Sequence, residues 1–212
     1  MKTVFASLAA LLIAAPASSA WAGEGGLRTS VGLRAGYSMP LGDWGKSPVV
    51  PSIDMIGGSI AVEVDFDVAF GERWSLAVEG GYAAVNGSAW EDYAAQCGEE
   101  LRISGSLMHC AVLLRPQLLM IGRSLLRLEL GPALLFASGE EVFDGERYPY
   151  DFLGGMSFGG KAGLEYVYLV AENIGLSLRG AVLVFPSATD PASSPAGTIT
   201  MVPLSAGLRI FL

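Results

Sequence analysis

The chain has 212 residues, of which 51% are hydrophobic and 16% are charged, and its formal net charge is −8. This acidic balance argues against nucleic acid as a partner, because binding to nucleic acid depends on clustered lysine and arginine. The mean hydropathy of +0.46 is high for a soluble domain, yet the chain after residue 22 has no run of the ~20 consecutive apolar residues that a spanning helix needs. A membrane-embedded chain of this kind must cross with β-strands, in which apolar and polar residues alternate.

Residues 1–22 have the pattern of an export signal. Lys2 gives a charged start, residues 4–15 form an apolar stretch, and Ala20-Trp21-Ala22 is similar to a signal-peptidase site. We predict cleavage after Ala22, which leaves residues 23–212 as a single barrel domain. Loss of Lys2 leaves 12 basic and 21 acidic residues, a formal net charge of −9.

Alternation of apolar and polar residues with a period of two dominates the rest of the chain and indicates β-strands. It predicts eight strands, each long enough for the ~9–11 residues of a tilted membrane strand, over residues 27–38, 59–70, 74–82, 103–115, 126–136, 156–166, 174–184 and 202–212. The run at 103–115 is apolar on both faces, so its orientation is not assigned.

The connections between these strands alternate in length. Short turns at 71–73, 121–123 and 171–173 alternate with long segments, rich in Gly, Pro, Ser and acidic residues, at 40–57, 87–102, 138–154 and 186–197. An even number of strands with short turns at one end and long loops at the other is typical of outer-membrane barrels. We therefore predict an all-β fold, a closed eight-stranded antiparallel up-and-down transmembrane β-barrel.

Alternation alone also fits a soluble lipocalin-like barrel, with its apolar face inside. Side-chain size favours the opposite orientation, because charged residues share their face with glycine, as in Gly32, Arg34 and Gly36. Long charged side chains in a narrow lumen need small neighbours, whereas glycine only weakens a strand that faces solvent. With the export signal, this pattern predicts an apolar face toward lipid.

Aromatic residues near both ends of the strands support this orientation. Phe70 and Trp74 flank a short turn, while Tyr37 and Phe136 precede long loops, as expected for aromatic girdles at the two membrane interfaces. We expect an integral protein of the bacterial outer membrane, surrounded by outer-membrane lipid and lipopolysaccharide, and a monomer.

The inner face then carries charges of both signs. Buried charges persist only when they are paired and hydrogen-bonded, so we predict an ion-pair network. Its members are Arg34, Arg127, Lys161, Arg179 and Arg209 with Glu63, Asp65, Asp67, Glu79, Glu129 and Glu165. Because eight strands leave a lumen only wide enough for side chains, we expect a polar plug in preference to a conducting pore.

The chain has two cysteines, Cys97 and Cys110. In an oxidising compartment they form either one disulfide or two unpaired thiols, and the sequence leaves both possibilities open. A bond requires the loop that carries Cys97 to fold back onto the strand, because the two Cα atoms must come within ~7 Å.

The mature chain resembles the small outer-membrane β-barrel superfamily, the OmpA-like and OmpW-like eight-stranded proteins. The resemblance rests on the leader, the eight runs, and the segments 113–116 (LLRP), 158–166 (FGGKAGLEY) and 206–212 (AGLRIFL). It implies biogenesis by the barrel-assembly machinery, which commonly reads a terminal aromatic residue; here Phe211 is penultimate. These features are specific for a fold and nearly silent about function.

Candidate chemistry is sparse. Residues 155–162 approach a phosphate-binding loop around Lys161 but lack its final Ser or Thr, and strand follows in place of helix. His109 is the single histidine, which excludes a multi-histidine metal site; a pairing with Ser104 or Ser106 keeps a lipid-modifying enzyme as an option. Acidic loop residues have no EF-hand spacing. We expect no cofactor, no metal and no enzymatic activity.

Three functions follow, in order of preference. The first is a structural or surface-interaction barrel with a plugged lumen. The second is transport of small apolar molecules, as implied by the resemblance to OmpW; it requires a continuous apolar lumen near the loop end, against which the charged residues argue. The third is a lipid A-modifying enzyme, which requires a hydroxyl within hydrogen-bond reach of His109.

Overall fold

The computed structural model describes residues 28–41, 58–70, 73–86, 88–98, 101–143, 145–149, 155–186 and 198–212. The predicted signal peptide, residues 1–22, lies outside these ranges and stays a prediction. Within them, no helix is long and apolar enough to cross a membrane.

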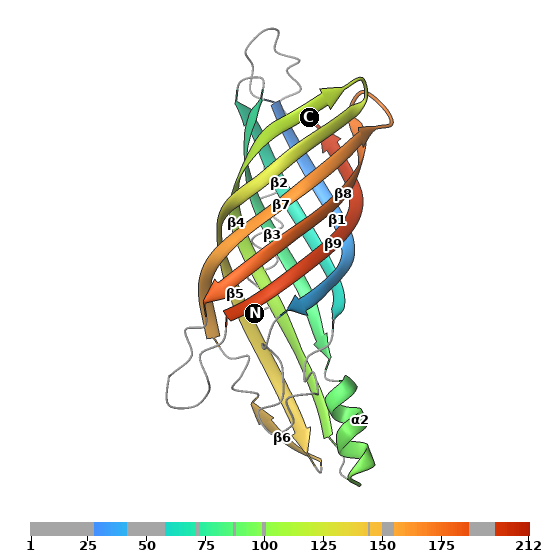
Figure 1. Cartoon of the computed structure of the whole chain (residues 1–212), viewed down its shortest axis with the longest axis vertical. Coiled ribbons are helices and arrows are strands. Elements are labelled where there is room, and N and C mark those ends of the chain that lie inside the picture. Colours follow the sequence, from blue (N-terminus) through green and yellow to red (C-terminus); the bar gives the residue numbers. More distant parts are fainter. Residues whose placement is uncertain are drawn as a thin grey trace.

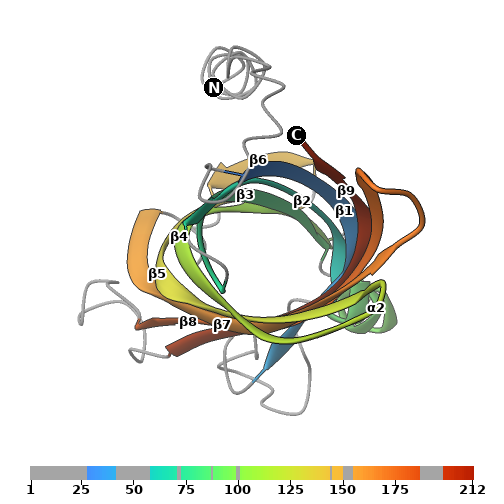
Figure 2. The same ribbon diagram turned by 90° about the horizontal axis from the view of Figure 1, so that it is seen from above.

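Eight long antiparallel strands form one closed barrel (Figures 1 and 2). They are β1 (Arg28–Leu41), β2 (Ser59–Phe70), β3 (Trp74–Asn86), β4 (Leu101–Ile121), β5 (Ser124–Phe143), β7 (Gly155–Leu169), β8 (Ile174–Pro186) and β9 (Thr198–Phe211). Each pairs with its neighbours in the chain, β5 pairs with β7, and pairing of β1 with β9 closes the ring. The predicted eight-stranded up-and-down barrel is confirmed.

The strand registers fix the width and tilt of the barrel. Starting from Thr29 on β1, we follow the paired residues from strand to strand around the barrel. The path comes back to β1 at Met39, ten residues further along. Eight strands with this stagger tilt by about 40° and enclose an interior that side chains can fill.

The alternation of side chains has the predicted orientation. Charged residues such as Arg34 are buried, while Leu33 is 59% and Ile60 72% exposed on the outer face. The structure also assigns β4, whose orientation the sequence left open: Leu113 and Arg115 face inward, and Val112 and Leu114 face outward. The outer wall is thus a surface of large apolar side chains, which suits hydrocarbon.

The segments predicted as loops at 87–102 and 138–154 contain regular structure. Strand β4 begins within the first segment and β5 ends within the second. The helix α2 (Ser88–Gln96) precedes β4, and the short strand β6 (Glu146–Pro149) pairs with β5 (Figure 1). Beyond the membrane a strand has no lipid face, so the alternation that marks strands in the sequence is not required there. Strands β5 and β6 are linked by an ion pair of 3.2 Å between Arg147 Nη1 and Glu140 Oε1.

Candidate functional site: the ion-pair network of the lumen

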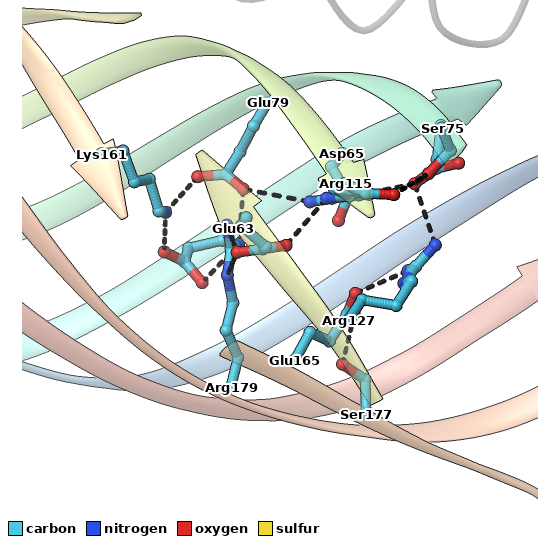
Figure 3. A network of polar contacts seen from close by, with 12 residues as sticks. Glu63, Asp65, Ser75, Glu79, Arg115, Arg127, Lys161, Glu165, Ser177 and Arg179 are labelled. Carbon is cyan, nitrogen blue, oxygen red and sulfur yellow. Dashed lines mark hydrogen bonds and ion pairs between the residues drawn. The ribbon is translucent and has the colours of Figure 1, made fainter. Parts of the chain in front are cut away.

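The inner face of the barrel holds an ion-pair network, part of which is drawn in Figure 3. Among the residues that the structure describes, its positive and negative groups are equal in number. Six cations face six carboxylates, and His109 joins them. The members are Arg34, Arg115, Arg127, Lys161, Arg179 and Arg209 with Glu63, Asp65, Asp67, Glu79, Glu129 and Glu165, and none of these residues, His109 included, is more than 7% exposed. The structure thus brings together all the charged residues predicted for the lumen and adds Arg115 and His109. The network has no net formal charge when His109 is neutral.

Asp65 is one centre of the network. Its carboxylate accepts hydrogen bonds from Arg115 Nη1 at 2.5 Å and Arg209 Nη2 at 2.9 Å, and also from Arg34 Nη2. These arginines come from three strands, β4, β9 and β1. The contacts therefore tie together parts of the wall that are distant in sequence.

Glu165 is a second centre, fully buried on β7. It accepts hydrogen bonds from Arg127 Nη2 at 2.6 Å, Arg209 Nη2 at 2.9 Å and Arg34 Nη1 at 3.1 Å. Ser177 Oγ donates a further bond of 2.7 Å. Arg34 and Arg209 bind both centres, so the network is continuous across the lumen.

The third centre joins two carboxylates, an ammonium and an imidazole. Lys161 Nζ donates to Glu63 Oε1 at 3.2 Å and to Glu79 Oε1, and His109 Nε2 donates to the same Glu79 oxygen at 3.0 Å. Ligand atoms of Glu63, Glu79 and His109 lie within 4.8 Å of one another, close enough to hold a metal ion. Because the Lys161 ammonium already lies against both carboxylates, it supplies the positive charge that an ion would bring.

Arg115 is the cation of the network that the sequence prediction omits. Besides Asp65, it binds Asp67 at 3.0 Å and Glu129 at 2.8 Å. Because residues 103–115 are apolar on both faces, the sequence does not show that Arg115 points inward. One signal was available: five predicted cations faced six acids, and a buried network with an unpaired carboxylate is strongly disfavoured.

The inward glycines have two separate roles. An added Cβ would lie 2.0 Å from His109 Cε1 at Gly81 and 2.5 Å from Asp65 Oδ2 at Gly32, so these glycines leave room for the network, as predicted. At Gly207 the Cβ would lie 2.0 Å from the Leu33 carbonyl oxygen, so this glycine allows two backbones to approach closely.

Toward the long loops the lumen becomes apolar. On β8 the inner face passes from Arg179 to Leu183 and Phe185, and on β9 it passes from Arg209 near the turn end to Met201 and Ile199. We call this region the apolar half; its members are Ala61, Ala83, Leu107, Ala111, Ala133, Leu135, Leu183, Phe185, Ile199 and Met201, all within one continuous buried cluster. The charges thus lie mainly nearer the short turns, and the inner face nearer the loops is mostly apolar, although Ser38 and Ser59 are buried there as well.

The residues considered for catalysis do not come together. His109 faces the lumen and binds Glu79, whereas Ser106 lies on the opposite face of β4 and shares a hydrogen bond of 3.0 Å with Ser138. Ser104 has the same outward parity and is exposed. Lys161 lies in strand β7, as a lumen cation and not in a phosphate-binding loop.

Both cysteines are free thiols in the structure. Cys97 is exposed just after α2, and Cys110 lies on β4 opposite Gly80, on the outward face. The structure therefore shows the two thiols unpaired.

Comparison with solved structures supports the fold. A major outer membrane protein from Thermus thermophilus aligns with a TM-score of 0.58 and 13% identity, over 88% of this chain and 99% of that one. Ail of Yersinia pestis (TM-score 0.48, 13% identity, 88% and 99%) and OprG of Pseudomonas aeruginosa (0.46, 11%, 88% and 95%) are also similar. No protein-family model and no curated protein sequence matches the chain. With its apolar exterior, the chain has the fold of a small integral outer-membrane β-barrel.

Proposed function

We propose that this protein is a non-enzymatic outer-membrane barrel with a structural or surface-interaction role, whose lumen is plugged by the ion-pair network. The observation that carries the proposal is the equality of six cations and six carboxylates, all buried. In this neutral set each carboxylate is ion-paired with at least one cation, so a permeating ion would have to displace an existing partner. The β4–β5 hairpin, with α2 and β6, projects beyond the barrel as the surface available to other molecules (Figure 1).

Planar-bilayer conductance of the refolded protein tests the plug. We expect no discrete current steps from the wild type. The double variant Arg179→Ala/Glu129→Ala removes two bonded partners, between which Arg179 Nε donates to Glu129 Oε2 at 2.5 Å, and keeps the network neutral while it creates space. This variant should give brief openings. Stable channels in the wild type would overturn the plug.

A second candidate function is passage of small apolar molecules, and the apolar half of the lumen favours it. Such a molecule could enter from the loop side but could not cross the ion-pair network, because charged groups would have to lose their partners. It would therefore have to pass laterally between strands into the membrane, as the resemblance to OmpW-like barrels implies.

Photolabelling with a small apolar diazirine tests this second function. If apolar molecules enter the lumen, the label should modify inward residues such as Leu183 and Phe185 as well as outward ones such as Leu178. Mass spectrometry of the digested protein locates the adducts. Labelling confined to the outward face would contradict entry of apolar molecules, and the structural role would then be the remaining candidate.

A further inference from the structure

We propose that Phe211 and Val167 form an apolar seal at the turn end of the lumen, which keeps water away from Arg209 and Glu165. The proposal rests on the plugged lumen proposed above and names the side chains that keep one end of it dry. Arg209 lies two residues before the end of β9 and Glu165 four residues before the end of β7, yet both are 0% exposed. Charged groups so close to the ends of their strands stay out of water only when other side chains cover them.

Phe211 faces the lumen. Side chains alternate along a strand, so Phe211 lies on the same face as Arg209 and opposite to Ile210, which is 46% exposed on the outer wall. Phe211 itself is partly buried. Its backbone is held on both sides, because it is paired with Ser30 on β1 and its N–H donates to the Asn173 carbonyl oxygen at 2.9 Å. The position of this inward side chain is therefore defined, although only one residue follows it.

Gly175 leaves the space that the seal fills. It is buried on the inner face of β8 and is paired directly with Arg209. A Cβ added at Gly175 would lie 2.5 Å from Val167 Cγ1 and 3.5 Å from Phe211 Cε2. Side chains of the two neighbouring strands, β7 and β9, thus occupy the place that a side chain of β8 would otherwise take. Together they lie beside the inward residue that pairs with Arg209.

Val167 belongs to a second apolar layer inside the barrel. It is 0% exposed and lies on the same face of β7 as Glu165, two residues nearer the turn end. It is not a member of the apolar half, which lies toward the loops, so its burial comes from neighbours at the turn end. They are Phe211, which it meets over Gly175, and Leu125, which is paired with Val167 and 8% exposed. Exclusion of water by this layer strengthens the ion pairs beneath it.

Strands β1 to β3 carry polar residues at the turn end instead. Ser30 and Ser75 face inward there, and Ser75 Oγ donates to Asp67 Oδ2 at 3.1 Å. The side chains of Arg127 and Asp67, which form an ion pair, are 7% and 3% exposed, whereas that of Arg209 is 0% exposed. Water at the turn end therefore reaches the network at Arg127 and Asp67, and is excluded where the apolar seal lies.

Hydrogen exchange of arginine side chains tests the seal. Nuclear magnetic resonance of the refolded protein in nanodiscs, with isotope-labelled arginine, resolves the Nε–H groups. Arg209 Nε donates to Glu165 Oε1 at 3.2 Å, and Arg179 Nε, farther from the turns, donates to Glu129 Oε2 at 2.5 Å. Phe211→Ala should speed exchange at Arg209 about tenfold, because exchange requires water to reach the donor. Exchange at Arg179 should stay at the wild-type rate.

Matched controls separate the seal from general loosening of the barrel. Ile210→Ala removes the outward neighbour of Phe211 and should leave exchange at Arg209 unchanged. Phe211→Leu keeps an apolar side chain at the position and should retain most of the protection. Val167→Ala opens the same seal from β7 and should also speed exchange at Arg209, which provides the measurement if Phe211→Ala does not refold. Equal acceleration at Arg209 by Ile210→Ala, or equal acceleration at Arg179 by Phe211→Ala, would overturn the seal.

The bilayer recordings described above distinguish failure of the seal from failure of the plug. If the wild type conducts while exchange at Arg209 depends on Phe211, the seal stands and the plug against ions is wrong. If the wild type gives no current steps and exchange at Arg209 is insensitive to both Phe211→Ala and Val167→Ala, the plug stands and the seal is overturned.

Discussion

At the scale of single residues, the lumen is a shared electrostatic structure and not a set of independent pairs. Asp65 and Glu165 each contact several arginines, and Arg34 and Arg209 bind both. Loss of one member therefore leaves an uncompensated charge on several neighbours. Removal of one partner from a buried ion pair is far more harmful than replacement of both by neutral groups.

Arg115→Met tests this view of the network. We expect the variant to lose about 3–5 kcal/mol of unfolding free energy, because Asp65 and Glu129 then lie buried with a missing partner. Urea titration in lipid vesicles measures the loss. Arg123→Met, at an exposed turn residue, should change stability by less than ~0.5 kcal/mol. Similar values for both variants would show that Arg115 is not part of a tightly coupled network.

Gly81→Ala tests whether an inward glycine is required by its side-chain neighbour. The added methyl group would lie 2.0 Å from His109 Cε1, so we expect a loss of about 1–3 kcal/mol from overpacking. Gly160→Ala is the matched control, because its Cβ would meet only the Gly131 carbonyl oxygen, at 3.7 Å. Unfolding titrations compare the two, and a neutral Gly81→Ala would contradict the packing of His109 against this glycine.

At the scale of elements, the strands within the membrane could be predicted from the sequence and the structure outside it could not. Lipid on one side and a filled lumen on the other impose strict alternation, and β2 and β8 follow it from end to end. Strand β4 was found but not oriented, because Leu107, Ala111 and Leu113 make its inner face apolar as well. Because the orientation of β4 was not assigned, neither Arg115 nor the apolar half of the lumen could be predicted. Helix α2 and strand β6 escaped prediction because they are short and lie where no such alternation is required.

Amide hydrogen exchange tests this division of the β4–β5 hairpin. Residues 107–111 of β4 pair with β3 on one side and β5 on the other, so we expect their amides to exchange at least about a hundredfold more slowly than those of β6, which pairs with β5 alone in the described part of the chain. Nuclear magnetic resonance in nanodiscs resolves the individual amides. Equal protection of β6 and residues 107–111 would contradict the account of β6 as an appended strand outside the barrel.

At the scale of the whole molecule, charge and apolar surface are separated into layers. The ion-pair network contributes no net formal charge when His109 is neutral, so the net charge of −8 lies outside it. The wall toward lipid is apolar, and the lumen divides into a polar part nearer the turns and an apolar half nearer the loops. Buried charges and buried apolar side chains therefore occupy different levels along the axis of the barrel.

The orientation of the wall underlies all of these conclusions, and spin-label accessibility on β8 measures it directly. Nitroxides placed singly at Leu176, Leu178, Val182 and Val184, with Ala171 in the adjoining turn as the reference, leave the ion-pair network intact. We predict that the four strand labels collide readily with oxygen and poorly with a water-soluble nickel chelate, and that Ala171 shows the reverse. Strand labels open to the nickel chelate and shielded from oxygen would place this face in water, and would contradict the account.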